Sequence, residues 1–228
     1  MIEIAKLEWD SNFFGYNVGK LQLLPNQELD MEEFLSASKA FKLVYIYTDR
    51  EIDHTACTLV DKKVTLLADT SANDLKSNIV SFDEQKHPYD QLQCLALQSG
   101  IYSRFKLDAN FKNNEYIKLY THWLAQSLKK DKALDVFVAE NNVIEGFITL
   151  EEKSDSVSSI GLIAVSDLAR GQGLGGELVK KTIDASFNMG YKQIQVVTQL
   201  QNEAALTLYN KFKFKITNVT NIYHYWNI

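Results

Sequence analysis

The chain has 228 residues, enough for one large domain or two small ones with a buried core. Hydrophobic residues make up 46% and charged residues 23%, and the net charge is −5, so composition gives no sign of the positive face that a duplex nucleic-acid binder needs. Two cysteines without paired spacing and the lack of a long apolar run argue against a disulfide scaffold, a signal peptide and a membrane span.

The first part of the chain mixes strands and one helix. Residues 17–23 predict a strand, and residues 43–47 and 64–68 predict two more. Residues 30–40 predict a helix with Asp30 as its N-cap, and its apolar side carries Phe34, Leu35 and Ala37. The polar segment 83–88 ends in Pro88, which resists both helix and central strand, and is the predicted linker.

After the linker the predicted order is two helices, three strands, a helix, a strand, a helix and two strands. The helices are expected at 89–98, 115–129, 174–189 and 202–211, and the strands at 135–139, 145–150, 158–165, 193–198, 214–219 and 222–226. The polar turn at 140–142 indicates a hairpin. We therefore predict an N-terminal α/β domain over residues 1–88 and a second domain over residues 89–228.

A glycine-rich segment follows the strand at 158–165 and opens the helix at 174–189. It consists of Arg170, Gly171, Gln172, Gly173, Leu174, Gly175 and Gly176. Such a turn aims several backbone N–H groups at one point, where the helix N-terminus adds partial positive charge. Glycines let the backbone approach a phosphate closely, and Arg170 adds a charged donor. The segment is therefore a predicted pyrophosphate cradle.

The glycines have two other interpretations. A dinucleotide-binding turn would follow the strand directly and would be followed about 20 residues later by an acidic residue that holds the ribose. Here several residues separate Val165 from Gly171, and the next strand ends in Thr198-Gln199-Leu200, without a carboxylate. A purely structural turn and helix cap needs fewer glycines than four within six positions.

The segment resembles the acetyl-CoA-binding motif of the GNAT superfamily of N-acetyltransferases, with Arg170, Gly173 and Gly175 in its three defined places. The order of elements after the linker and the ending at 202–214 are also similar, although Lys213 stands where the family usually has glycine. The resemblance implies an α+β protein: a GNAT acyl-CoA N-acyltransferase fold with a mixed, splayed central sheet flanked by helices, preceded here by the small α/β domain.

The resemblance also implies roles for individual residues. Acetyl-CoA is the implied cofactor, with its pyrophosphate on the backbone of 171–176 and Asn202 in contact with it, although Asn202 also suits an N-cap. The pantetheine arm is implied to pair with Leu162, Ile163, Ala164 and Val165. An oxyanion donor is expected near Ile163. Tyr209 occupies the place of the family's general acid, and the alternative for it is a half-buried aromatic of the helix.

No residue stands out as the general base. His122 and Glu151 are candidates by residue type, and a chain of waters would serve as well. The four histidines show no metal-ligand spacing, so no metal is expected. No G-x-S-x-G nucleophile motif occurs, and direct transfer to an amine needs none.

A narrower resemblance covers most of the chain. Residues 7–15, 103–105 and 196–199 are similar to the bacterial dTDP-fucosamine acetyltransferases, which implies an amino-sugar nucleotide as the acceptor. Arg104 suits phosphate recognition and Phe105 suits packing against a sugar or base. The alternative is a surface arginine beside a core phenylalanine. Trp9, Phe13 and Phe14 could line the site, but aromatics at the start of a domain are more often core.

The sequence therefore predicts a cytoplasmic N-acetyltransferase that moves acetyl from acetyl-CoA to a nucleotide-linked amino sugar, a small-molecule substrate. We expect neither a nucleic acid nor a membrane as partner, and a homodimer stays open. The alternatives are acetylation of a protein N-terminus, a polyamine or another small amine, or a non-catalytic acetyl-CoA-binding sensor. A nucleotide-sugar site should present cationic groups, whereas a polyamine site should present carboxylates.

Overall fold

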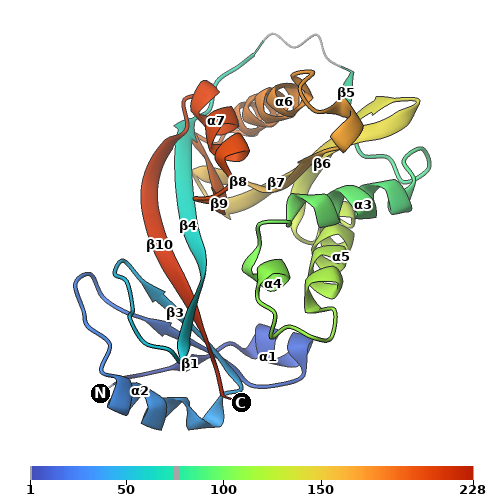
Figure 1. The fold of residues 1–228 in the computed structure, drawn as a ribbon. Helices are drawn as coiled ribbons and strands as arrows, with labels where there is room; N and C mark the ends of the chain where they lie inside the picture. Colours follow the sequence, from blue (N-terminus) through green and yellow to red (C-terminus); the bar gives the residue numbers. More distant parts are fainter. Residues whose placement is uncertain (1, 74–77, 228) are drawn as a thin grey trace.

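The computed structural model describes residues 2–73 and 78–227, whose strands form one ten-stranded mixed sheet (Figure 1). Across the sheet the order is β1 (Ala5–Lys6), β2 (Val18–Gln22), β3 (Leu43–Thr48), β10 (Lys215–Trp226), β4 (Cys57–Asp69), β9 (Gln193–Gln199), β8 (Val157–Val165), β7 (Val143–Ser154), β6 (Ala133–Asn141) and β5 (Ile79–Ser81). Neighbouring strands pair antiparallel, apart from β2 with β3 and β8 with β9, which are parallel.

The long strands β4 and β10 join the two ends of this sheet. β10 pairs with β4 from Lys215 to Tyr225 and with β3 from Asn221 to Trp226. In Figure 1 both strands run from the α6 and α7 end of the molecule to the end that carries β1–β3. β4, from the first part of the chain, also pairs with β9, so the sheet continues across the predicted boundary at residue 88. The two-domain division itself stays a prediction.

Helices cover both faces of the second half of the sheet. α3 (Tyr89–Ser99) and α5 (Glu115–Leu128) pack on one face, and α6 (Leu174–Asn188) packs on the other. Alternation along β6 explains this arrangement: Val136 and Val138 join the core beneath α3 and α5, whereas Phe137 and Ala139 join the core beneath α6. α7 (Glu203–Lys211) lies beside α6, with Tyr209 in the same core.

The remaining helical elements are short. They are α1 (Glu8–Phe14), α2 (Met31–Ala37), the 3₁₀ turns η1 (Ser38–Ala40) and η2 (Asp167–Ala169), and α4 (Arg104–Leu107). Asp30 caps α2 as predicted, because its side chain accepts a hydrogen bond from the Glu33 N–H at 3.0 Å. Phe34 is fully buried, but Leu35 is exposed, contrary to its predicted place on the apolar side.

The end of the chain differs from the prediction of two strands at 214–219 and 222–226. Residues 215–226 form one strand, β10, with register irregularities at two points against β4. The polar pair Thr220-Asn221 resembles a turn in the sequence. In the structure the Asn221 side chain donates to the Arg50 carbonyl at 2.9 Å, so a buried amide is satisfied inside a continuous strand.

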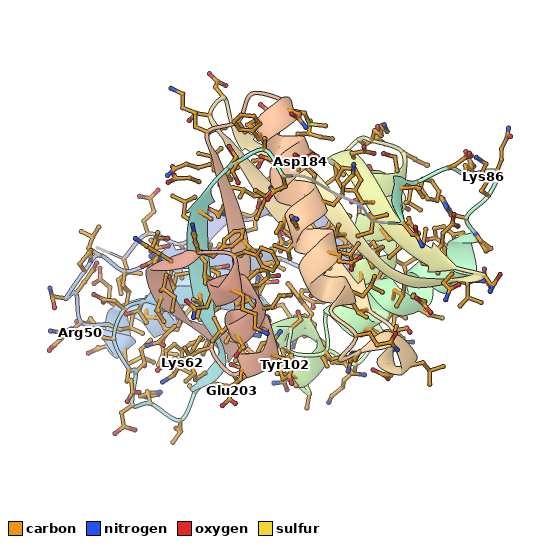
Figure 2. The ribbon with its side chains drawn as sticks, turned by 90° about the horizontal axis from the view of Figure 1, so that it is seen from above. Arg50, Lys62, Lys86, Tyr102, Asp184 and Glu203 are labelled. Carbon is orange, nitrogen blue, oxygen red and sulfur yellow. The ribbon has the colours of Figure 1, made fainter. Side chains whose placement is uncertain are left out.

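Arg50, which follows β3, and Lys86, which precedes α3, lie at opposite ends in Figure 2. Among the described residues, no helix is long and apolar enough to cross a membrane.

Candidate active site

The strands β8 and β9 separate in the middle of the sheet. Their pairing ends at Ile160 opposite Val196, although both strands continue beyond this point. β8 also bulges against β7, where two residues, Gly161 and Leu162, stand opposite Thr149. The Thr149 hydroxyl accepts a hydrogen bond from the Leu162 N–H at 2.8 Å. The result is an open backbone edge on β8 after Ile160.

The glycine-rich segment lies beyond the end of β8. Gly171 and Gly173 have φ of +77° and +86°, in the region that favours glycine, and α6 begins at Leu174. Within the described chain, no hydrogen bond uses the backbone N–H groups of residues 171–175, so these donors are available at the helix N-terminus. Arg170 forms an ion pair with Asp167 at 2.7 Å and remains exposed.

A cavity of about 820 Å³ connects the segment to the gap between β8 and β9. Most of the residues predicted from sequence line it: Arg104, Phe105, Leu162, Ile163, Ala164, Val165, Arg170, Gly171, Gly173, Leu174, Gly175, Gly176, Asn202 and Tyr209. Gln172 does not line it, and its side chain donates to the Leu168 carbonyl at 3.2 Å. The structure thus places these predicted residues, which lie between positions 104 and 209 in the sequence, around one cavity. Their roles stay predictions.

Tyr209 and Asn202 reach the cavity from α7. Tyr209 is 2% exposed, and burial raises the pKa of its hydroxyl, which is therefore protonated at neutral pH. Asn202 is the N-cap of α7, because its Oδ1 accepts a hydrogen bond from the Ala205 N–H at 3.2 Å. Asn202 also lines the cavity, so its role as N-cap is compatible with the predicted contact to the cofactor.

Arg104 and Phe105 belong to the short helix α4. The Arg104 guanidinium carbon lies 4.9 Å from the Tyr45 ring centroid and 4.4 Å from that of Phe105. Its Nε is buried without a hydrogen-bond partner in the described chain. Phe105 is 6% exposed and packs in the core beneath α3 and α5, and it also lines the cavity. It is therefore both a core residue and part of the cavity wall.

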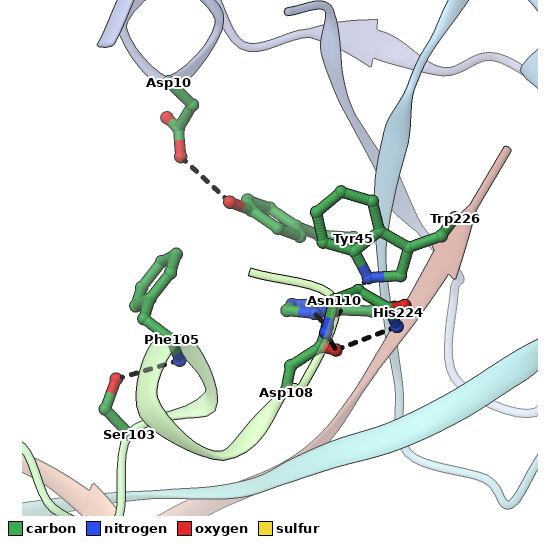
Figure 3. Close-up of polar contacts among 8 residues, drawn as sticks. All are labelled: Asp10, Tyr45, Ser103, Phe105, Asp108, Asn110, His224 and Trp226. Atoms are coloured by element: carbon green, nitrogen blue, oxygen red, sulfur yellow. Dashed lines mark hydrogen bonds and ion pairs between the residues drawn. The ribbon is translucent and has the colours of Figure 1, made fainter. Parts of the chain in front are cut away.

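Asp108 anchors the end of α4 to β10 (Figure 3). Its Oδ2 accepts hydrogen bonds from His224 Nδ1 at 2.6 Å and Trp226 Nε1 at 2.8 Å. Burial works to raise the pKa of Asp108, but these bonds and one from the Asn110 N–H outweigh it and hold the pKa at about 2. Burial lowers the pKa of His224 to about 4. At neutral pH a neutral imidazole therefore donates to an ionised carboxylate and fixes the segment that carries Arg104.

The two candidate bases lie in different surroundings. His122 is packed against Trp9 and Phe13, with ring centroids 5.7 and 5.4 Å away, and it does not line the cavity. Glu151 does line the cavity, but it is bound to Lys132 at 2.6 Å. Trp9, Phe13 and Phe14 do not line the cavity either, and Phe13 and Phe14 pack against the core.

Sequence reasoning missed a polar group on β4. Asp61 and Lys63 project into the cavity from one face of this strand, and Gln199 of β9 lies beside them. Asp61 is 5% exposed, its Oδ1 has no partner among the described residues, and burial raises its pKa to about 6 against the influence of Arg104, Lys63 and Gln199. The predicted strand at 64–68 left these residues out, because Asp61, Lys62 and Lys63 form a run of charged residues without the alternation that predicts a strand.

Comparison with known proteins identifies the fold and the family. The family model described as Acetyltransferase (GNAT) family matches residues 96–214. The dTDP-fucosamine acetyltransferase of Escherichia coli O6:H1 is 25% identical over 212 residues, which cover 90% of each chain. The mycothiol acetyltransferase of Corynebacterium efficiens is 26% identical over 43% of this chain and 34% of its own length.

Solved structures show the same fold at low identity. A functionally unknown conserved protein from Staphylococcus epidermidis has a TM-score of 0.65 at 11% identity and covers 93% of this chain and 85% of its own. An acetyltransferase of the GNAT family from Colwellia psychrerythraea has a TM-score of 0.56 at 12% identity, with coverage of 92% and 80%. The chain belongs to the GNAT acetyltransferase family and is an N-acetyltransferase that uses acetyl-CoA.

Proposed function

We propose that the enzyme acetylates the amino group of a nucleotide-linked amino sugar. The observation that carries the proposal is the charge of the cavity, whose lining has five basic residues, Lys63, Arg104, Lys132, Arg170 and Lys211, and two acidic ones, Asp61 and Glu151. This excess suits an acceptor with a diphosphate and opposes a polyamine. The amino-sugar nucleotide enzyme that matches 90% of the chain, β4 included, supports the same class of acceptor.

The proposed cofactor site is the glycine-rich segment and the open edge of β8. The unpartnered N–H groups of residues 171–175 would hold the pyrophosphate, as a helix N-terminus does for anions generally. Residues 162–165 would pair with the pantetheine amides, because β8 has no strand partner on that side after Ile160. Acetyl-CoA supplies an activated acetyl group as its thioester.

Asp61 is the proposed general base. An amino group that is protonated in water must lose a proton before it attacks the thioester carbon. Asp61 lines the cavity, and its carboxylate, whose Oδ1 has no hydrogen-bond partner among the described residues, is ionised above a pH of about 6. Glu151 is less suitable as a base because its carboxylate is held in an ion pair with Lys132.

Tyr209 is the proposed general acid. As the C–N bond forms, charge collects on the carbonyl oxygen and then on the departing sulfur as the C–S bond breaks. The Tyr209 hydroxyl, kept protonated by burial, would donate its proton to that sulfur. The products are the acetylated amine and the thiol of the coenzyme.

The acceptor proposal is tested by steady-state kinetics on a panel of amines. A nucleotide-linked 4-amino sugar, the same sugar without its nucleotide, a lysine peptide and spermidine are compared by release of coenzyme thiol and by product mass. The expected kcat/KM for the nucleotide-linked sugar exceeds each of the others by more than about tenfold, which corresponds to one lost charged contact. An equal rate on the peptide or spermidine contradicts the proposal. Binding of acetyl-CoA without turnover of any amine would favour a sensor.

A further inference from the structure

Three cationic side chains from separate elements lie against Tyr45 and Tyr47 of β3. Lys20 of β2 places its Nζ 4.7 Å from the Tyr47 ring centroid, and Lys63 of β4 places its Nζ 5.5 Å from the same centroid. Arg104 of α4 lies over the neighbouring Tyr45 ring at 4.9 Å. Tyr45 and Tyr47 share one face of β3, since they are two residues apart on the strand. The cations therefore meet on one face of the sheet.

None of these three side chains has an ion pair or hydrogen bond to a carboxylate in the described parts of the chain. Burial lowers the pKa of Lys63, and the charges of Arg104 and Lys20 lower it further, while Asp61 opposes them. Asp61 and Asp10 offset part of the charge of Arg104, but the repulsion of Lys63 by Arg104 and Lys20 is unfavourable in the free protein. Such an arrangement is typical of a binding site for an anion, which removes the repulsion when it binds.

We infer that Lys20, Lys63 and Arg104 form the subsite for the diphosphate of a nucleoside diphosphate, the nucleotide part of the acceptor. The inference rests on the proposed function and locates the acceptor in it. Lys63 and Arg104 line the cavity, and Lys20 extends the cluster on the far side of Tyr47. The guanidinium is held between Tyr45 and Phe105, so its planar fork is oriented before an anion arrives.

The position also separates this subsite from the cofactor. The cofactor segment 170–176 follows β8, whereas the cluster is built on β2, β3 and β4 together with α4. Asp61 is two residues from Lys63 on the same face of β4, so a diphosphate on the cluster would place the attached sugar close to the proposed base. The N-terminal part of the chain thereby acquires a direct role in acceptor recognition.

The test is calorimetric titration with thymidine diphosphate in the presence of saturating coenzyme A, which occupies the cofactor segment. Lys63→Gln and Arg104→Gln should each weaken binding about tenfold or more, and Lys20→Gln should weaken it severalfold, because each removes one charge-assisted contact. Thymidine without phosphates should bind much more weakly to the parent and should not distinguish these variants. Inorganic pyrophosphate should follow the same order of variants as the nucleotide.

Lys62→Gln is the matched control. Lys62 precedes Lys63 on β4 but points to the other face, where it pairs with Glu51 at 3.4 Å, and it is labelled in Figure 2. Its removal changes the net charge equally and should leave binding unchanged. Coenzyme A affinity and the Tm identify any variant that has lost its fold. Arg104→Lys, which keeps the charge but not the fork, replaces Arg104→Gln if that variant does not fold, and it should also weaken binding.

Two results overturn the subsite. One is no binding of thymidine diphosphate to the parent, and the other is equal affinity in the parent and in folded Lys63→Gln and Arg104 variants. If the amino-sugar nucleotide is nevertheless turned over, the proposed function stands and its diphosphate is held elsewhere. If the diphosphate binds as described but only other amines are acetylated, the subsite stands and the acceptor proposal fails.

Discussion

Tyr209 combines a buried hydroxyl with a place on the cavity wall. A group that donates its proton only as the sulfur leaves contributes to the transition state and not to binding of acetyl-CoA. Tyr209→Phe should therefore lower kcat by about 10²–10⁴-fold with nearly unchanged acetyl-CoA affinity, if chemistry limits the rate. Steady-state kinetics and a direct titration of the cofactor measure the two quantities.

Tyr223→Phe provides the contrast for this substitution. The Tyr223 hydroxyl is also buried, but it accepts a hydrogen bond from the Ile52 N–H at 2.9 Å and does not line the cavity. Its loss should lower the free energy of unfolding by about 1–2 kcal/mol and leave kcat unchanged. A Tyr209→Phe enzyme with kcat within about threefold of the parent would remove Tyr209 from the mechanism.

The carboxylate of Asp61 is buried, and its Oδ1 has no hydrogen-bond partner among the described residues. Its pKa is about 6 in the folded protein and about 3.9 when unfolded, so the stability it contributes falls as the pH rises from about 4 through 6. At pH 7.5 the ionised Asp61 therefore lowers the free energy of unfolding by its full amount, on the order of 3 kcal/mol at most. Asp61→Asn should therefore raise the free energy of unfolding at pH 7.5, and the gain should disappear near pH 4.

The same substitution should make the enzyme much slower. Without the base, kcat should fall by about 10²–10⁴-fold. In the parent, kcat/KM should fall as the pH drops through about 6, because the carboxylate becomes protonated. Glu151→Gln is the comparison, since Glu151 lines the same cavity in an ion pair with Lys132. A greater loss of kcat in Glu151→Gln than in Asp61→Asn would assign the base to Glu151.

At the scale of elements, the turn between β8 and α6 is the feature that depends most on glycine. Gly173 has φ of +86°, it lines the cavity, and a Cβ there would meet open space, so a side chain would occupy room beside the proposed phosphate site. Gly173→Glu should abolish the rise in Tm that acetyl-CoA causes, because a carboxylate would repel the pyrophosphate. Thermal denaturation with and without the cofactor measures the rise.

The backbone strain of that substitution needs its own control. Gly190 also has a positive φ, of +91°, and open space for a Cβ, but it follows α6 at the opposite end. Gly190→Glu should cost similar stability in the absence of ligand while the rise in Tm with acetyl-CoA stays normal. Full stabilisation of Gly173→Glu by acetyl-CoA would place the pyrophosphate elsewhere.

The elements differ in how far sequence alone could predict them. The helix at 174–189 and the strand at 158–165 were predictable because apolar residues recur at a clear period beside glycines that mark the turn. The continuity of β10 was not, since polar residues such as Asn221 find partners only after the chain has folded. The same is true of Asp61 and Lys63, whose place beside Gln199 depends on pairing between strands more than 130 positions apart.

At the scale of the whole molecule, β4 is the central connection. It lies between β9 and β10, so the second half of the chain cannot complete its sheet without a strand from the first half. The full chain should therefore unfold in one transition that is the same by circular dichroism and by tryptophan fluorescence. The fragment 89–228 should not form a stable domain, because β9 and β10 would be left without their shared partner. Two separate transitions, or a folded fragment, would support independent domains instead.

The most direct test of the account is a crystal structure with coenzyme A and a nucleotide-linked amino sugar bound together. We predict the coenzyme pyrophosphate on residues 170–176 and the sugar amine in the same cavity, about 3–4 Å from the sulfur, between Tyr209 and Asp61. The diphosphate of the sugar nucleotide should contact Lys63 and Arg104. A coenzyme bound away from the glycine-rich segment, or a sugar nucleotide bound outside the cavity, would contradict the account.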